Sequence, residues 1–264
     1  MKGRVLIVAG SDSGGGAGIQ ADIKTVTMLD AFAATAITAL TAQNTEGVHG
    51  VLPVAPAFIR RQMEVVLDDI GADAVKTGML HDAAVIETVA AVLAERAPTA
   101  PLVLDPVMVA KGGARLIEES AIDALKRRLV PRAAVLTPNL TEAEVLGGRP
   151  IGDAAAMREA ARALLDLGCG AVLLKGGHLP GDIVHDMLAT PAGFEEWTSP
   201  RIKTRHTHGT GCTLASAIAA GLAQGQTVSE AVTRARAFVL RAIAGAPGFG
   251  RGHGPLDHAH PLHD

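Results

Sequence analysis

The sequence predicts an α/β fold in three α/β/α layers, with a central, mostly parallel β-sheet. Short aliphatic runs alternate with longer segments of helical periodicity along most of the 264 residues. The aliphatic runs show little polar alternation, which is typical of parallel strands covered by helices on both faces. The composition is 48% hydrophobic and has no break along the chain, so we expect one domain over residues 1–264.

The expected strands alternate with the expected helices as far as residue 175. The strands are predicted at residues 4–9, 34–40, 74–77, 102–105, 133–137 and 171–175. The helices are predicted at residues 18–29, 57–69, 83–95, 119–128, 141–146 and 154–167. The pattern then changes to a hairpin, with strands at 185–189 and 195–198 around a turn at 191–193. Helices at 213–223 and 229–244 follow, and the tail from Gly245, rich in Gly, Pro and His, is expected to be irregular.

Charge and composition argue against several classes of function. The net charge is −3, and the sequence holds five Phe, one Trp and no Tyr, which argues against a nucleic-acid partner. No apolar run is about 20 residues long, so no membrane span is expected. The N-terminus shows no signal-peptide pattern before the first strand. Cys169 and Cys212 form no disulfide framework, so a reducing, cytoplasmic location is expected.

Polar and glycine residues collect at the ends of the predicted strands. In open α/β sheets, ligands bind beyond the C-terminal ends of the strands. The residues in these positions are Gly10-Ser11-Asp12, Thr41, Gln43 and Asn44, Gly78-Met79, Asp105-Pro106, Thr137-Pro138-Asn139 and Lys175-Gly176-Gly177. We therefore expect them to line one edge of the sheet as a binding site, together with the loop at 209–212.

The stretch at 208–219 is the predicted catalytic centre. Its two loop glycines permit a tight turn, and Thr210 or Thr213 is expected to cap the helix that follows. The unpaired N–H groups and the positive dipole end of that helix favour phosphate, most of all as charge builds up during phosphoryl transfer. Cys212 lies in the same field, so its thiol pKa is expected to fall below about 8.5. The alternative is a structural helix start with a small buried cysteine.

A glycine cluster follows the first strand, at residues 13–18. It contains Gly16-x-Gly18-x-x-Ala21, which matches a dinucleotide fingerprint, but the loop is too long and no acidic residue closes the second strand. A loop that lets the backbone approach a small ligand is favoured, and a structural turn remains an alternative. The sequence lacks the phosphate-binding P-loop pattern, so the loop at 209–212 is the candidate for binding ATP.

Charged residues that follow three strands suit a site for phosphate and a cation. Asp105 closes a strand where its carboxylate can reach Mg²⁺, although a turn or capping role is the alternative. Asn139 and Glu142 open a helix, where capping by Thr141 and a dipole interaction of Glu142 are the alternative. Lys175 ends a strand before two glycines, so its charge is expected to reach phosphate rather than solvent alone.

Histidines gather late in the sequence but match no zinc-binding spacing. His258, His260 and His263 are expected to be solvated residues of the tail. Cys169 precedes a strand and is expected in or near the core.

Stretches along the full chain resemble the hydroxymethylpyrimidine/phosphomethylpyrimidine kinases, a branch of the ribokinase-like superfamily. In order, they are AGSDSGGGAGIQAD at 9–22, TALTAQNT at 38–45, KTGML at 76–80, DPVM at 105–108, TPNLTEA at 137–143, KGGH at 175–178, HGTGCTL at 208–214 and GHGP at 252–255. The resemblance implies a ribokinase-like fold, a homodimer, and the use of ATP and Mg²⁺. It also implies phosphorylation of 4-amino-5-hydroxymethyl-2-methylpyrimidine to the monophosphate and then the diphosphate, in thiamine biosynthesis.

The same resemblance implies residue roles. Gln43 is similar to the glutamine that hydrogen-bonds the aminopyrimidine edge, and the other implied pocket residues are Gly10, Ala17, Asp22, Met79 and Val107. The implied metal ligands are Asp105 and Glu142, and the implied nucleotide contacts are Lys175, Asn139 and Thr210. The implied catalytic residues are Lys175 and the anion-hole loop of Gly209, Thr210, Gly211 and Cys212. Most of the superfamily carries Asp where this branch has Cys, which leaves Cys212 open between a base and a loop residue.

Three other functions compete with this one, and the weakest is a dinucleotide-dependent oxidoreductase, which would bind NAD at Gly16-x-Gly18-x-x-Ala21. A pyridoxal or pyridoxine kinase of the same superfamily would take a similar flat heteroaromatic ring with a hydroxymethyl group, but Gln43 and the run at 38–45 favour the aminopyrimidine. A non-catalytic pyrimidine-binding protein would need a damaged phosphate site, whereas Lys175, Asp105 and the loop at 209–212 are intact.

Overall fold

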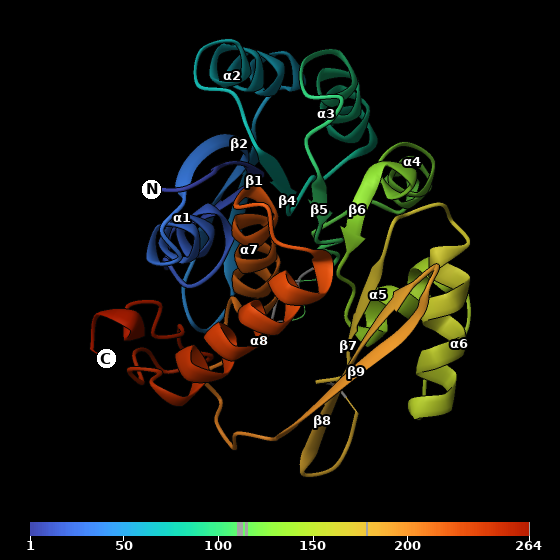
Figure 1. The fold of residues 1–264 in the computed structure, drawn as a ribbon. Helices are drawn as coiled ribbons and strands as arrows, with labels where there is room; N and C mark the ends of the chain where they lie inside the picture. The colour runs from blue at the N-terminus through green and yellow to red at the C-terminus, as the bar shows by residue number, and fades with distance from the viewer. Residues whose placement is uncertain (110–112, 114–115, 178, 264) are drawn as a thin grey trace.

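A mixed β-sheet forms the middle layer of the molecule (Figure 1). The computed structural model describes residues 1–109, 113, 116–177 and 179–263. Within them the sheet has the order β3-β2-β1-β4-β5-β6-β7-β8-β9, parallel from β2 to β7 and antiparallel at both edges. The strands are β1 (Arg4–Asp12), β2 (Phe32–Gln43), β3 (Val48–Pro53), β4 (Ala74–Thr77), β5 (Leu102–Leu104), β6 (Ala133–Leu136), β7 (Val172–Lys175), β8 (Ile183–Thr190) and β9 (Gly193–Pro200).

Helices cover both faces of this sheet (Figure 1). They are α1 (Gly18–Met28), α2 (Pro56–Asp69), α3 (Ala83–Arg96), α4 (Glu119–Arg128), α5 (Leu140–Gly147), α6 (Ala154–Leu165), α7 (Thr210–Ala223) and α8 (Val228–Ala244). Successive residues of β1 point to opposite faces: Leu6 and Val8 pack in a core with α2 to α6, whereas Val5 and Ile7 pack in a second core with α1, α7 and α8. The predicted three layers and mostly parallel sheet are confirmed.

The predicted elements exist, with ends that differ by a few residues. The strand at 74–77 and the helix at 119–128 match the structure, and the predicted hairpin forms β8 and β9. The strand β3 was not expected, because it is an exposed edge strand of mixed polar and apolar residues with no buried face. Within the described residues, no helix is long and apolar enough to cross a membrane.

The caps of two helices differ from expectation. Asn139, not Thr141, caps α5, since its Oδ1 accepts from the Glu142 N–H at 2.9 Å while Glu142 Oε2 accepts from the Asn139 N–H at 2.8 Å. This reciprocal pair is a capping box. Helix α7 begins at Thr210, three residues before the predicted start, and Gly209 occupies the N-cap position without a side-chain cap. Neither threonine side chain caps α7, and the Thr210 N–H donates to the Thr207 carbonyl oxygen at 3.4 Å. The N–H groups of Gly211 and Cys212, which follow in the first turn, are the ones left for a ligand.

The prediction that the tail histidines are solvated is wrong for two of the three. His258 and His260 are buried, and His263 is exposed. His258 Nε2 lies 2.9 Å from the Thr213 hydroxyl, and His260 Nε2 lies 3.1 Å from the Phe238 carbonyl oxygen. The tail is irregular apart from one 3₁₀ turn at His260–Leu262, but these contacts hold it against α7 and α8. Cys169 is buried in the core, as expected.

Candidate active site

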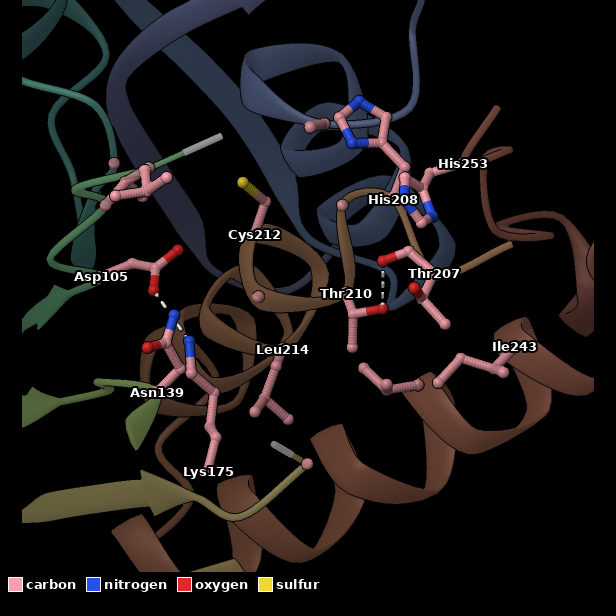
Figure 2. A pocket seen from close by; sticks show the side chains of 18 of the residues that line it. Asp105, Asn139, Lys175, Thr207, His208, Thr210, Cys212, Leu214, Ile243 and His253 are labelled. Carbon is pink, nitrogen blue, oxygen red and sulfur yellow. Dashed lines mark hydrogen bonds and ion pairs between the residues drawn. The ribbon is translucent and has the colours of Figure 1, made fainter. Parts of the chain in front are cut away.

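A cleft of about 850 Å³ opens where the parallel strands end (Figure 2). It combines the strand ends with the start of α7, as the strand-end rule predicts for an open α/β sheet. Five of the predicted strand-end residues are not in its lining: Asn44, Pro106, Thr137, Pro138 and Gly176. Of the site residues implied by the family resemblance, all but one line it: Gly10, Ala17, Gln43, Met79, Asp105, Val107, Asn139, Glu142, Lys175, Gly209, Thr210, Gly211 and Cys212. The exception is Asp22. His178, the last residue of the KGGH stretch, lies outside the described residues.

One side of the cleft carries an ion pair between strand ends. Lys175 Nζ, at the end of β7, lies 3.2 Å from Asp105 Oδ1, just after β5. The Thr137 hydroxyl donates to the same carboxylate oxygen at 3.3 Å. Both charged side chains are largely buried, with 14% and 3% exposed, so the dielectric around them is lower than in water and their charges act strongly.

Glu142 places a second carboxyl group beside this pair. Burial raises the pKa of Glu142, and the charge of Asp105 raises it further, while Lys175 lowers it; the result is about 7. Asp105 and Glu142 thus place two carboxyl groups near the single positive charge of Lys175. A structural salt bridge needs only one carboxylate for one lysine, whereas two carboxyl groups suit a hard metal ion. Within the described residues, no cluster of three or more His, Cys, Asp or Glu side chains could hold a metal alone.

The loop before α7 directs the N-terminal end of the helix at the Lys175–Asp105 ion pair (Figure 2). A Cβ atom on Gly211 would lie 3.2 Å from Lys175 Nζ and 3.7 Å from Asp105 Oδ2, so the first turn of α7 directly faces the ion pair. The Thr210 hydroxyl donates to the Thr207 carbonyl oxygen at 2.8 Å, which fixes the loop. The free N–H groups and the helix dipole form an anion site next to a cation.

The far end of the cleft suits a flat ring. Gly10 and Met79 lie in contact there, since a Cβ on Gly10 would be 3.2 Å from Met79 Sδ. Ala17 and Val107 add small apolar surfaces, and the Gln43 side chain adds one amide. Apolar walls with a few placed polar groups are the usual make-up of a small-molecule site.

Asp22 is not among the residues that line the cleft, and its implied pocket role stays a prediction. Its carboxylate is fully buried and accepts from Lys76 Nζ at 2.9 and 2.8 Å and from the Ser216 hydroxyl at 2.7 Å. This cluster links α1, β4 and α7, because Asp22 lies on the inward face of α1. Lys76 was not predicted as a residue of the site. Its place in the strand Ala74–Thr77, which is buried at every position, could have indicated it, because a buried lysine is almost always paired with an opposite charge.

A family model described as phosphomethylpyrimidine kinase matches residues 12–257. The chain belongs to the phosphomethylpyrimidine kinase family. It is 50% identical, over 98% of its length, to a hydroxymethylpyrimidine/phosphomethylpyrimidine kinase of Streptomyces coelicolor, of which it covers 95%. It is 55% identical to the thiamine biosynthesis bifunctional protein ThiED of Geobacter sulfurreducens, but spans only 52% of that protein. The predicted family is thus confirmed, and the chain is a phosphotransferase of this family.

Solved structures share the ribokinase-like fold of the family. An ADP complex of a Bacillus subtilis pyridoxal kinase has a TM-score of 0.91 and 38% identity, with 98% of each chain covered. A phosphomethylpyrimidine kinase from Clostridium difficile has a TM-score of 0.81 and 39% identity, covering 92% of this chain and all of that one. Fold similarity therefore does not separate pyrimidine kinases from pyridoxal kinases, and the site residues have to do so.

The expected thiolate at Cys212 is not what the structure supports. Burial raises the pKa of the Cys212 thiol, Asp22 and Asp105 raise it further, and Lys76 and the Gly18 N–H lower it; the result is about 12. In the ligand-free site, a neutral thiol is therefore available, and the loop N–H groups and Lys175 carry the positive potential.

We expect Cys212 to react slowly with iodoacetamide at pH 7, with a rate that rises about tenfold per pH unit, because only the thiolate is nucleophilic. Mass spectrometry of the Cys169→Ser variant would follow Cys212 alone. A fast rate that does not change with pH would show that the thiol is ionised and that the raised pKa is wrong.

Proposed function

We propose that this chain transfers the γ-phosphoryl group of ATP to the hydroxymethyl group of 4-amino-5-hydroxymethyl-2-methylpyrimidine, and then phosphorylates the resulting monophosphate. The observation that carries this proposal is that one cleft joins an amide-bearing ring site at Gln43 to a cation and anion-hole site at Lys175 and the loop 209–212. A hydroxymethyl group on a ring at the first site would point along the cleft to the second.

The protein contributes position and charge to this reaction. Phosphoryl transfer has a loose transition state, so most of the catalysis comes from holding the reactants in line and stabilising the negative charge. Lys175 would hold the phosphate oxygens of the nucleotide, with Asn139 and Thr210 as further contacts. The N–H groups at the start of α7 would bind the transferring group. The substrate hydroxyl then needs only to be held facing it, with the Cys212 thiol alongside.

Asp105 and Glu142 fit the Mg²⁺ that an ATP-dependent kinase requires. Protein Mg²⁺ sites commonly use one or two carboxylates together with phosphate oxygens of the substrate. When bound, the ion would neutralise phosphate charge and orient the nucleotide. Lys175, now paired with Asp105, would then be free to turn toward the phosphates.

Binding of Mg²⁺ and ATP is expected to release a proton from Glu142. The pKa of Glu142 is about 7 without a ligand, and a cation favours the charged form and lowers that pKa. Affinity should therefore rise with pH between about 6 and 8 and level off above. Calorimetry in two buffers with different ionisation heats would measure the released proton. The Glu142→Gln variant should bind more weakly without this pH dependence; an unchanged dependence in that variant would assign the proton to another group.

An ADP-release assay with Mg²⁺ and ATP would test the proposed function, with products read by mass. The hydroxymethylpyrimidine and pyridoxine would be compared as substrates. Mono- and diphosphorylated pyrimidine would support the proposal, including its second step. Pyridoxine phosphate alone would reject it in favour of a vitamin B6 kinase, and binding of pyrimidine without ADP release would favour a non-catalytic protein.

The pyridoxine kinase is the second candidate, because structural relatives with TM-scores of 0.90 and above are named pyridoxal kinases. The family match and Gln43 in the ring site favour the pyrimidine over it. We also propose that the chain acts as a homodimer in the cytoplasm, which its family resemblance supports; sedimentation would test the dimer.

A further inference from the structure

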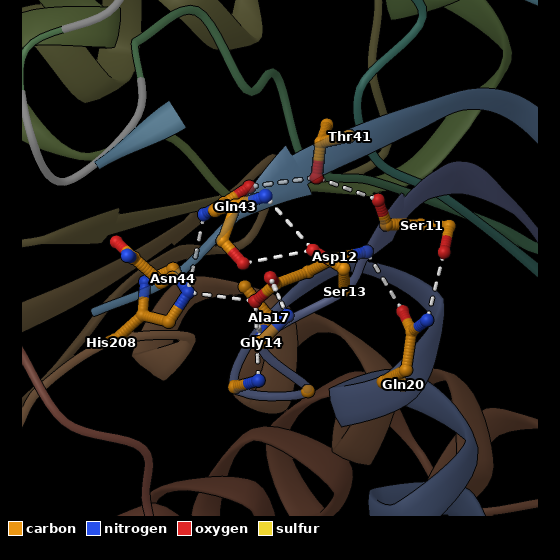
Figure 3. Close-up of polar contacts among 12 residues, drawn as sticks. Ser11, Asp12, Ser13, Gly14, Ala17, Gln20, Thr41, Gln43, Asn44 and His208 are labelled. Carbon is orange, nitrogen blue, oxygen red and sulfur yellow. Dashed lines mark hydrogen bonds and ion pairs between the residues drawn. The ribbon is translucent and has the colours of Figure 1, made fainter. Parts of the chain in front are cut away.

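A buried His208–Asp12 contact lies beside Gln43 at the ring end of the cleft (Figure 3). His208 Nε2 lies 2.8 Å from Asp12 Oδ2, and the two residues are only 8% and 3% exposed. Gly16 packs against the same edge of the imidazole ring, where a Cβ atom would lie 2.5 Å from His208 Cδ2. The main chain at His208 is joined to Gly254, with its N–H donating at 3.2 Å. These contacts hold the ring with its Nε2 facing Asp12.

The hydrogen bonds around Asp12 decide which atom carries the proton. Its carboxylate accepts from the N–H groups of Gly14 at 2.8 Å, Gly16 at 3.1 Å and Ala17 at 2.8 Å. Burial raises the pKa of Asp12, but the hydrogen bonds from His208 and from this backbone outweigh burial and hold it below its usual value. An ionised carboxylate only accepts hydrogen bonds. His208 must therefore donate from Nε2.

The proton on His208 Nε2 limits how the side-chain amide of Gln43 can be oriented. One end of the carboxamide, drawn as Nε2, lies 3.3 Å from His208 Nε2, and the other, drawn as Oε1, lies 3.1 Å from the Thr41 hydroxyl (Figure 3). A protonated His208 Nε2 cannot accept from an NH₂ group. The Thr41 hydroxyl donates to the Ser11 carbonyl oxygen at 2.9 Å, so it has lone pairs, and no hydrogen, left for Gln43.

The oxygen and the NH₂ group of a carboxamide have nearly the same shape. The hydrogen-bond donors and acceptors around Gln43 therefore determine which of its two orientations is correct. With the oxygen toward His208 and the NH₂ group toward Thr41, every donor has an acceptor. In that orientation Gln43 also keeps one N–H and one oxygen lone pair for a ligand, in a fixed order along the cleft.

We propose that His208, held by Asp12, is a specificity-determining positioning residue that fixes the polarity of the Gln43 amide for an aminopyrimidine. This proposal rests on the proposed function. The edge of a 4-aminopyrimidine presents a ring nitrogen that only accepts beside an amino group that donates, so it fits one amide orientation. The hydroxyl of a hydroxypyridine such as pyridoxine donates or accepts, so it tolerates both orientations.

The test compares the ratio of kcat/KM for the hydroxymethylpyrimidine to that for pyridoxine among variants. His208→Leu keeps bulk but removes the donor, and should lower the ratio about tenfold or more, chiefly through KM for the pyrimidine, because a reversed amide would set donor against donor. His208→Gln has an NH₂ group that can reach both Asp12 and Gln43, and should keep the ratio within about threefold of wild type.

A matched control separates this effect from a general loosening of the loop. Gln20 accepts from the Asp12 N–H at 2.9 Å and donates to the Ser11 hydroxyl at 2.8 Å, so it supports the same loop without contacting His208 or Gln43. Gln20→Ala should leave the substrate ratio unchanged. If His208→Leu leaves the ratio unchanged, or if Gln20→Ala lowers it equally, the proposal is overturned.

Nitrogen NMR of the ligand-free protein tests the amide orientation without any enzymatic activity. The expected result is a protonated Nε2 on His208, and a nuclear Overhauser contact from the Gln43 NH₂ group to the Thr41 methyl group. An unprotonated Nε2 with the Gln43 NH₂ group against the His208 ring would overturn the proposal. If the wild-type protein phosphorylates neither substrate, the kinetic assay rejects the proposed function. The NMR result would still show whether His208 fixes the orientation of the Gln43 amide.

Discussion

The Gly209→Ala variant is expected to lose about 10²-fold or more of its turnover. Gly209 is the N-cap of α7 with φ +84°, and a Cβ atom there would lie 1.8 Å from the Gly16 carbonyl oxygen. The side chain can be accommodated only if the loop 209–212 and the loop at 13–18 move apart. A displacement of about 1 Å at a catalytic loop costs about 10²-fold in rate, and here it affects the anion hole and the ring site together.

Gly225→Ala is the matched control for this variant. Gly225 follows the other end of α7 with φ +82°, but a Cβ atom there meets nothing within 4 Å. It should cost only the left-handed backbone penalty of about 1 kcal/mol and leave turnover unchanged. Steady-state rates and thermal unfolding of both variants would separate the effect of the left-handed backbone from that of the steric clash with Gly16. Normal turnover in Gly209→Ala would mean that the loop is not the anion hole.

The fold could be predicted because its buried strands are short aliphatic runs. Strand ends were less predictable: β1 and β2 continue to Asp12 and Gln43, polar residues whose backbone pairs with a neighbour that local sequence does not reveal. The site was predictable for a related reason. Parallel strands that end at one edge bring Asp105, Asn139 and Lys175 together without any detail of side-chain contact.

Pairings between distant residues could not be predicted in this way. Asp22 meets Lys76 and Ser216, which lie 54 and 194 positions away, so its burial depends on how α1, β4 and α7 pack. The raised pKa of Cys212 depends on the same packing, because its largest cause is burial, which the local sequence does not reveal. His258 and His260 are in a segment with the composition of a loop, yet contacts with α7 and α8 bury them.

The Lys175→Met variant is expected to lower turnover by about 10³-fold, at the upper end of the loss seen when one preorganised charge or donor is removed from a transition-state site. Met keeps the length of the side chain and removes only the charge that would hold the phosphates. The same change leaves the Asp105 carboxylate, 3% exposed, without its partner. We therefore expect a loss of about 3 kcal/mol in the free energy of unfolding as well.

A double variant separates these two effects. Lys175→Met together with Asp105→Asn removes both charges of the pair, so no buried carboxylate is left unpaired at position 105 and much of the stability should return. Turnover should stay low, because neither the phosphate contact nor the metal ligand is restored. Denaturant unfolding and single-turnover rates would be measured on the single and double variants. If turnover recovered along with stability, Lys175 would serve only to neutralise Asp105, and the phosphate contact would have to come from another residue of the cleft.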